Sequence, residues 1–170
     1  TMMGYKRLTH LESCLDRIIE EKIPGDLFEA GCWRGGSVAF MLGFLQASND
    51  NRNVWAADSF QGYPKPDNKS YEEDKFLYDH PEYFAVTKET FLKTIKKYNV
   101  DSEHLKILQG WFNETIPMAN INELALIRID VDGYTPVMNV LELLYGKLST
   151  GGYVIIEDYK PPGCREAVDE

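Results

Sequence analysis

Short apolar segments alternate with amphipathic ones along the whole chain, and this alternation restricts the fold more than any other feature of the sequence. Apolar residues three or four positions apart predict helices, and short apolar runs between turn residues predict strands. The run 124–129 is almost continuously apolar, which is typical of a central strand covered on both faces. The expected helices are 8–19, 36–47, 87–98 and 135–145, and the expected strands are 26–30, 53–57, 105–108, 124–129 and 153–156. Strands that alternate with helices pair in parallel, so we expect an α/β fold with helices on both faces of a parallel sheet.

Composition restricts the class of protein further. The 170 residues fit one domain spanning 1–170, and 44% hydrophobic with 26% charged residues is an ordinary globular balance. A net charge of −9 argues against nucleic acid as a partner. The apolar stretch 38–45 is too short to span a membrane, and no secretory signal is visible. Three scattered cysteines indicate reduced thiols in a cytoplasmic protein.

The segment 60–86 lacks a clear period, although it carries seven of the chain's 21 aromatic residues. Long irregular loops inside compact domains are usually lids or binding loops, so we interpret these residues as a lid segment. His80 lies in it and is an alternative base, although a solvated loop histidine is the favoured interpretation. The final residues 164–170 resemble the beginning of a helix, and we expect the sequence to be a piece of a longer protein.

A glycine-rich turn joins the first strand to its helix and reads Glu29-Ala-Gly-Cys-Trp-Arg-Gly-Gly-Ser37. Ligands of open parallel sheets bind near such a turn. A phosphate loop would need a lysine before Ser37, and a dinucleotide fingerprint would need glycine where Trp33 stands. The remaining pattern favours S-adenosylmethionine, with Glu29 receiving its ammonium group. The alternative is that the glycines only make a tight turn.

Asp58 ends the second strand, where a carboxylate can accept hydrogen bonds from both hydroxyls of a ribose. Taken alone, this residue is better explained as a strand-end acid or a helix cap. Together with Glu29 it indicates a ligand that contains adenosine.

A second group of acids follows the fourth and fifth strands. It consists of Asp130, Asp132, Glu157 and Asp158. Because neighbouring parallel strands end at the same edge of a sheet, these carboxylates are expected to converge, and a hard cation such as Mg²⁺ would relieve their repulsion. The alternative is that the acids cap helices or pair with Arg128 and Lys160.

Further segments complete a pattern that covers almost the whole chain. They are Thr1-Met-Met-Gly4, Pro24-Gly-Asp-Leu27, Trp33-Arg-Gly-Gly36, Asp58-Ser-Phe-Gln-Gly62, Gly110-Trp-Phe112, Asp130-Val-Asp132, Gly151-Gly-Tyr-Val-Ile155 and Asp158-Tyr159. With these motifs the chain resembles the macrocin O-methyltransferase family of macrolide and aminocoumarin antibiotic biosynthesis. The resemblance implies a Rossmann-like class I methyltransferase fold, here truncated after the fifth strand.

The resemblance also implies a role for each matching residue. Asp132 is the implied general base, and Asp130, Glu157 and Asp158 are the implied Mg²⁺ ligands. The implied contacts to S-adenosylmethionine are Thr1, Met2, Glu29, Gly31, Trp33, Arg34, Gly35, Ser37, Asp58, Ser59, Phe60 and Trp111. The family usually has aspartate at the position of Glu157 and glycine at that of Val131.

These patterns lead to one leading hypothesis and two alternatives. We expect a Mg²⁺-dependent O-methyltransferase that acts on a hydroxyl, on a sugar of a small metabolite, and that forms a homo-oligomer without nucleic-acid or membrane partners. The alternatives are a module that binds the cofactor without turnover and a nicotinamide-dependent oxidoreductase, against which Trp33 argues.

Overall fold

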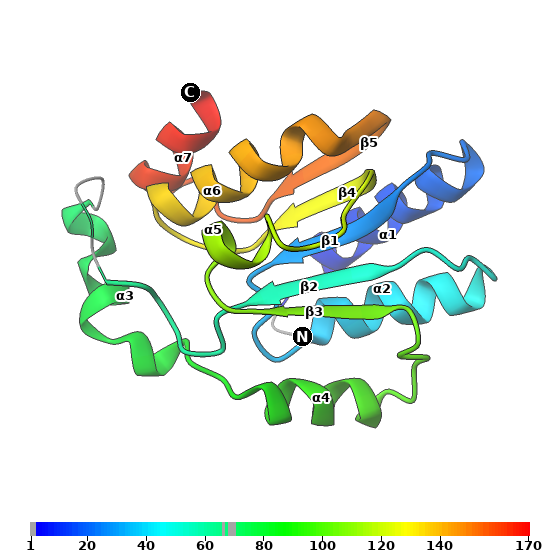
Figure 1. Cartoon of the computed structure of the whole chain (residues 1–170), viewed down its shortest axis with the longest axis horizontal. Coiled ribbons are helices and arrows are strands. Elements are labelled where there is room, and N and C mark those ends of the chain that lie inside the picture. Colours follow the sequence, from blue (N-terminus) through cyan, green and yellow to red (C-terminus); the bar gives the residue numbers. More distant parts are fainter. Residues whose placement is uncertain (1–2, 66, 68–70) are drawn as a thin grey trace.

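In a computed structural model of the chain, five parallel strands form one sheet in the order β3-β2-β1-β4-β5 (Figure 1). The structure describes residues 3–65, 67 and 71–170. The strands are β1 (Asp26–Ala30), β2 (Val54–Asp58), β3 (Leu105–Gln109), β4 (Leu124–Ile129) and β5 (Leu148–Ile156). This confirms the predicted α/β architecture and the neighbouring positions of the fourth and fifth strands.

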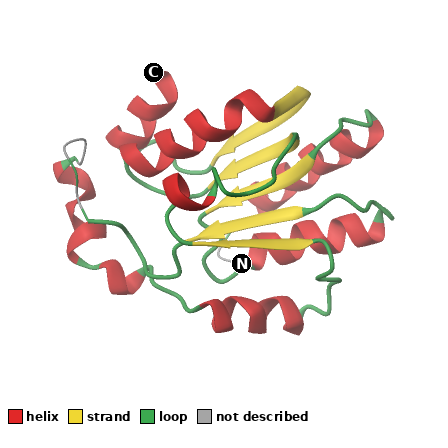
Figure 2. Cartoon of the chain, viewed as in Figure 1, coloured by secondary structure: helices red, strands yellow, loops and turns green. Residues whose placement is uncertain are grey.

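Helices cover both faces of the sheet, and each face has its own apolar core (Figure 2). On one face lie α1 (Tyr5–Glu20), α2 (Gly36–Ala47) and α4 (Lys88–Lys97), and on the other lie α5 (Phe112–Thr115), α6 (Tyr134–Leu144) and α7 (Pro162–Asp169). Every residue of β4 is buried, as its continuous apolar run predicts. No helix in the described part of the chain combines the length and apolar character needed to cross a membrane.

The lid segment is more regular than its sequence indicates. It contains the helical turns η1 (Glu72–Asp74) and η2 (Pro81–Tyr83) around α3 (Lys75–Asp79), and it projects from one end of the sheet (Figure 1). The expectation of an irregular loop was therefore wrong in detail. Helices this short do not complete enough turns to show a period in the sequence.

Further boundaries differ from expectation, because β5 begins at Leu148 rather than at 153 and α7 begins at Pro162 rather than at 164. Helix α6 begins at Tyr134, one residue before the expected start at 135, and Gly133 is its N-terminal flanking residue. The short helical end of the chain forms α7, which packs on α6. The short helical turn η3 (Tyr145–Lys147) leads from α6 into β5.

Candidate cofactor and acceptor site

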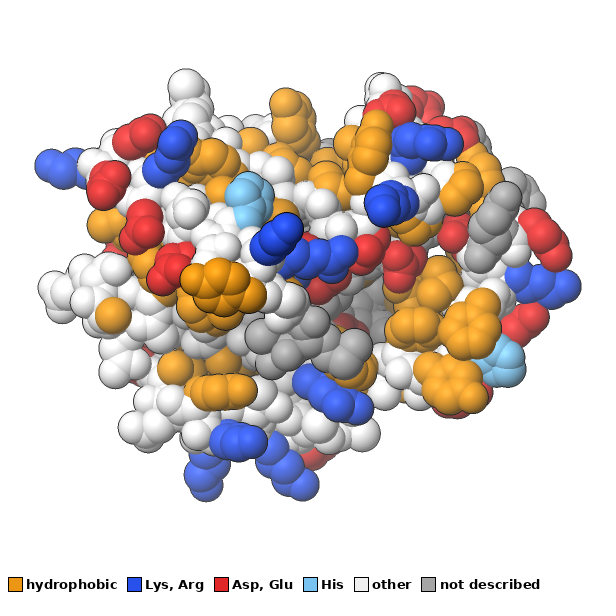
Figure 3. Space-filling view, turned by 180° about the vertical axis from the view of Figure 1, so that it is seen from behind, with side chains coloured by type: hydrophobic (Ala, Val, Ile, Leu, Met, Phe, Trp, Pro, Cys, Tyr) orange, Lys and Arg blue, Asp and Glu red, His pale blue; other side chains and the backbone are white. Residues whose placement is uncertain are grey.

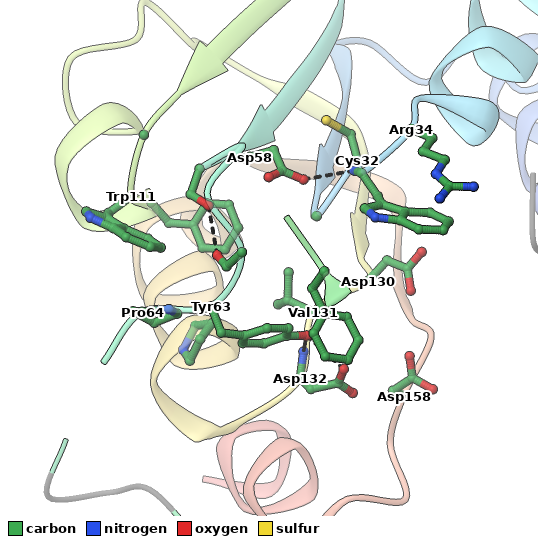
Figure 4. A pocket seen from close by; sticks show the side chains of 18 of the residues that line it. Cys32, Arg34, Asp58, Tyr63, Pro64, Trp111, Asp130, Val131, Asp132 and Asp158 are labelled. Carbon is green, nitrogen blue, oxygen red and sulfur yellow. Dashed lines mark hydrogen bonds between the residues drawn. The ribbon is translucent and has the colours of Figure 1, made fainter. Parts of the chain in front are cut away.

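A pocket of about 1240 Å³ lies where the strands end at their carboxyl termini. Its walls come from the turn after β1, the segment that follows β2, the loops after β3 and β4, and Asp158 after β5. Tyr83 and Phe84 of the lid segment add a further wall. Figure 4 shows Trp111 at one side of this pocket and Asp130, Asp132 and Asp158 at the other. The pocket therefore joins the predicted cofactor residues to the predicted acidic cluster.

The glycine-rich turn lies directly against the end of β4. Gly31 has φ +79°, and a Cβ at this position would collide with the backbone carbonyl oxygen of Asp130. Trp33 also has a positive φ of 42°, and its ring carries the guanidinium of Arg34 at 4.1 Å from the ring centroid. Glycine at position 31 thus keeps the first turn and the acidic loop in contact.

Asp58 lies in the pocket wall with both carboxylate oxygens already engaged. Its Oδ2 accepts a hydrogen bond of 2.8 Å from the backbone N–H of Trp33, and its Oδ1 accepts one of 2.8 Å from that of Phe60. Burial raises the pKa of Asp58, and these two bonds partly oppose that rise. Each oxygen keeps a further lone pair for a ligand hydroxyl.

Glu29 lies beneath the pocket and does not form part of its wall. Its fully buried Oε1 accepts hydrogen bonds from Ser37 Oγ at 2.5 Å and from Arg128 Nη1. The other oxygen, Oε2, is buried and has no hydrogen-bond partner within the described residues. Burial raises the pKa of Glu29 to about 7, while Arg128 and Ser37 oppose the rise.

Three of the four predicted acids line the pocket, and Glu157 does not. Glu157 Oε1 accepts a hydrogen bond of 2.9 Å from Arg128 Nε, and Glu157 Oε2 lies 3.3 Å from Nε of Arg7. Arg128 also donates from Nη2 to Asp130 Oδ2 at 3.0 Å. The pairing with Arg128, which the sequence left open, is therefore present. Among the residues that the structure describes, no group of three or more His, Cys, Asp or Glu side chains is arranged to hold a metal ion.

Asp132 has a partner that the sequence analysis did not include. The hydroxyl of Tyr63 donates a hydrogen bond of 2.8 Å to Asp132 Oδ2, and the backbone N–H of Asp132 donates one of 3.1 Å to the same hydroxyl (Figure 4). The two residues are 69 positions apart, and no local pattern links them. The sequence signal for this contact was the concentration of aromatic residues in the lid segment, which indicated that the segment takes part in binding.

The other predicted contacts occupy different positions around the pocket. Ser59 and Trp111 line it, whereas Phe60 is buried beneath it against Phe91, with ring centroids 5.6 Å apart. Gly35 precedes α2 with φ +77°. The predicted contacts at Thr1 and Met2 lie outside the described residues.

His80 lies on the exposed part of the lid segment and is not in the pocket wall. Its Nδ1 is 3.4 Å from Glu82, and the rings of Phe76 and Tyr83 pack against it. Figure 3 shows hydrophobic side chains gathered on the side of the molecule where the lid segment projects.

Comparisons with known proteins agree with these observations. A family model described as macrocin O-methyltransferase (TylF) matches residues 1–170. The chain is 41% identical to demethyldecarbamoylnovobiocin O-methyltransferase of Streptomyces niveus over 174 residues, and 41% identical to mycinamicin III 3''-O-methyltransferase of Micromonospora griseorubida over 175. These matches cover 100% of this chain but only 66% and 69% of those proteins. The chain thus spans about two thirds of the length of these relatives.

Solved structures give the same result for the fold. The O-methyltransferase NovP superposes with a TM-score of 0.94 at 41% identity, covering 100% of this chain and 72% of that one. The calicheamicin methyltransferase CalS11 has a TM-score of 0.76 at 18% identity, covering 96% of this chain and 69% of that one, and supports the fold alone. The chain belongs to the macrocin O-methyltransferase family.

Proposed function

We propose that the protein transfers a methyl group from S-adenosylmethionine to a hydroxyl on a sugar of a small metabolite. The observation that carries this proposal is that one pocket contains both Asp58, the candidate ribose acceptor, and Asp132, the candidate base. The names of two relatives support a glycosylated acceptor. One is the mycinamicin III 3''-O-methyltransferase, and the other is a tetracenomycin 4'-O-methyltransferase whose name includes a rhamnosyl group. Membership of the family argues against the nicotinamide-dependent alternative.

The residues around Asp58 fit an adenosine-containing co-substrate. Asp58 is held by two backbone N–H groups, so its position is set before a ligand arrives. Trp111, in the loop after β3, supplies an aromatic surface in the same pocket. Glu29 Oε2, which has no hydrogen-bond partner among the described residues, suits a positively charged group of the co-substrate.

The acids fit a Mg²⁺ ion in part. Asp130 and Asp158 supply hard oxygen donors in the pocket wall. Glu157, which the family resemblance makes a third ligand, is held by Arg128 and Arg7. It would join the ion only by leaving Arg7, so we propose Asp130 and Asp158 as the principal protein ligands.

The chemistry of such a site follows from its residues. When bound, S-adenosylmethionine supplies an electrophilic methyl group, and Mg²⁺ supplies a Lewis acid that lowers the pKa of a hydroxyl. Asp132 takes the hydroxyl proton as the acceptor oxygen forms its bond to the methyl carbon. Methyl transfer would break the carbon–sulfur bond and leave its electron pair on sulfur, so the products would be a methyl ether and S-adenosylhomocysteine. Asp132 then returns the proton to solvent.

A second candidate is a module that binds the co-substrate without turnover, which the pairing of Glu157 with two arginines favours.

Calorimetry with S-adenosylmethionine, with and without Mg²⁺, measures binding. Mass spectrometry after incubation with demethyldecarbamoylnovobiocin and mycinamicin III then measures methyl transfer. We expect binding and a product that gains one methyl group. Asp132→Asn should keep the binding and reduce product formation by about 10²–10⁴-fold. Binding with no S-adenosylhomocysteine released from any acceptor would favour the module.

A further inference from the structure

Tyr63 and Asp132 are joined at two points inside the pocket. The tyrosine hydroxyl donates to Asp132 Oδ2 at 2.8 Å and accepts from the Asp132 backbone N–H at 3.1 Å. Both residues line the pocket, and Figure 4 shows their side chains meeting there. One hydroxyl therefore holds the carboxylate and the backbone of the same residue.

Asp132 needs such a partner because its surroundings are acidic. Asp130 and Asp158 line the same pocket, so the Asp132 carboxylate lies among other carboxylates. Within residues 3–65, 67 and 71–170, Tyr63 is the side chain that donates a hydrogen bond to this carboxylate. A neutral donor orients a base without the strong loss of basicity that an adjacent cation would cause.

Tyr63 is itself held by the turn that precedes it. Ser59 Oγ donates to the carbonyl oxygen of Gly62 at 2.8 Å and accepts from the backbone N–H of Gln61 at 3.0 Å. Gly62 has φ +90°, and a Cβ there would collide with the carbonyl oxygen of Pro81 in the lid segment. Glycine at this position thus lets the turn approach the lid segment closely.

Two further contacts limit the freedom of Tyr63. Pro64 follows it and disfavours the helical region for its backbone. The ring of Tyr63 packs edge to face against that of Phe84, with centroids 5.0 Å apart and planes at 87°. The hydroxyl is therefore presented to Asp132 from a well-supported ring.

The same turn begins at Asp58. The Asp58 carboxylate accepts from the N–H of Phe60, and the chain then reaches Tyr63 within one turn. The candidate ribose acceptor and the partner of the candidate base are thus parts of one short segment, so this segment spans both halves of the pocket.

We infer that Tyr63 is a positioning residue that fixes the Asp132 carboxylate for proton transfer and ties the lid segment to it. The catalytic part of this inference rests on the proposed function. The contact itself does not, because it can be measured without an acceptor.

The first experiment measures amide hydrogen exchange in Tyr63→Phe, which keeps the ring on Phe84 and removes only the hydroxyl. We expect the Asp132 amide to exchange at least tenfold faster, because it loses its acceptor, while the Leu126 and Ile127 amides keep their rates. Tyr145→Phe, which removes a tyrosine hydroxyl from η3, is the matched control and should change none of these rates. An unchanged Asp132 amide in Tyr63→Phe overturns the inference, whether or not the protein methylates any acceptor.

The second experiment compares turnover of demethyldecarbamoylnovobiocin by the wild type, Tyr63→Phe, Asp132→Asn and the double variant. We expect Tyr63→Phe to lower kcat ten- to hundredfold, with KM and the Kd of S-adenosylmethionine changed less than twofold. The double variant should be within threefold of Asp132→Asn, because Tyr63 acts through Asp132. A double variant tenfold slower than Asp132→Asn, or an equal loss in co-substrate affinity, overturns the catalytic role. A wild type without turnover refutes the proposed function together with this catalytic role, and the exchange result then decides the contact alone.

Discussion

Arg128 and Glu29 form an ion pair in which neither side chain has exposed surface. Arg128 is held at the same time by Asp130 and Glu157, so one buried cation serves three carboxylates below the pocket. Taking these charges out of water is costly, and the arrangement is tolerated because each member has a partner. Three carboxylates below the pocket therefore share Arg128 as their counter-ion.

Replacing Arg128 with methionine should destabilise the fold by about 3–5 kcal/mol, because Glu29 and Glu157 lose their buried counter-ion. Urea denaturation gives the free energy of unfolding. The control is Arg165→Met on the exposed part of α7, which is expected to change the free energy of unfolding by less than about 0.5 kcal/mol. Equal effects of the two substitutions would mean that the ion pair contributes nothing to stability.

The raised pKa of Glu29 predicts a particular pH dependence of stability. Between its ordinary value of 4.5 and about 7, the folded protein keeps a proton on Glu29 that the unfolded chain releases. The stability of the wild type relative to Glu29→Gln should therefore fall as pH rises through this window, by up to about 1.4 kcal/mol per pH unit. Urea denaturation of both proteins at pH 5, 6, 7 and 8 measures the difference. If the stability of the wild type relative to Glu29→Gln rises with pH instead, Glu29 is already ionised throughout this window and the expected pH dependence is wrong.

Asp58→Ala should lower the affinity for S-adenosylmethionine at least tenfold. It removes a charged acceptor of two ribose hydrogen bonds, each worth about 1.5–3 kcal/mol at most. Titration calorimetry measures the Kd, and Asp101→Ala is the matched control, since Asp101 also accepts a backbone N–H but lies in an exposed loop. Unchanged binding by Asp58→Ala would remove the ribose assignment.

Features of the fold and the site that are formed by residues close together in the sequence could be predicted, whereas contacts between distant residues could not. The apolar run of β4 and the glycine turn after β1 are continuous in sequence, and both were predicted correctly. The contact between Tyr63 and Asp132 joins residues 69 apart, and it exists only because the lid segment returns to the end of β4. Glu29 was predicted at the end of β1, but its burial with Arg128 depends on a neighbouring strand.

Arg7 is expected to compete with a metal ion. It is half exposed, and its guanidinium lies 3.3 Å from Glu157 and 3.6 Å from Asp158. Arg7→Met should tighten Mg²⁺ binding by about two- to fivefold, the range that a partly exposed ion pair allows. Calorimetry with Mg²⁺ alone tests this without turnover, and Lys6→Met, an exposed neighbour, is the control. Weaker binding in Arg7→Met would mean that Arg7 helps to build the site.

The outer edge of β5 leads to a prediction about assembly. β5 pairs only with β4 in the described sheet, and α7 packs on α6, so the C-terminal helix does not extend the sheet. Open edges of apolar strands are rarely left exposed, so either a second copy of the chain or further residues of a longer protein are expected to cover this one. We propose the second copy. Sedimentation velocity at micromolar concentration should show a dimer or larger species, which Val154→Lys should dissociate. Ile107→Lys places the same charge on β3 at the opposite edge, and is expected to cost similar stability while leaving the assembly intact. A strictly monomeric wild type whose β5 amides exchange as fast as loop amides would leave this edge open and refute the proposal.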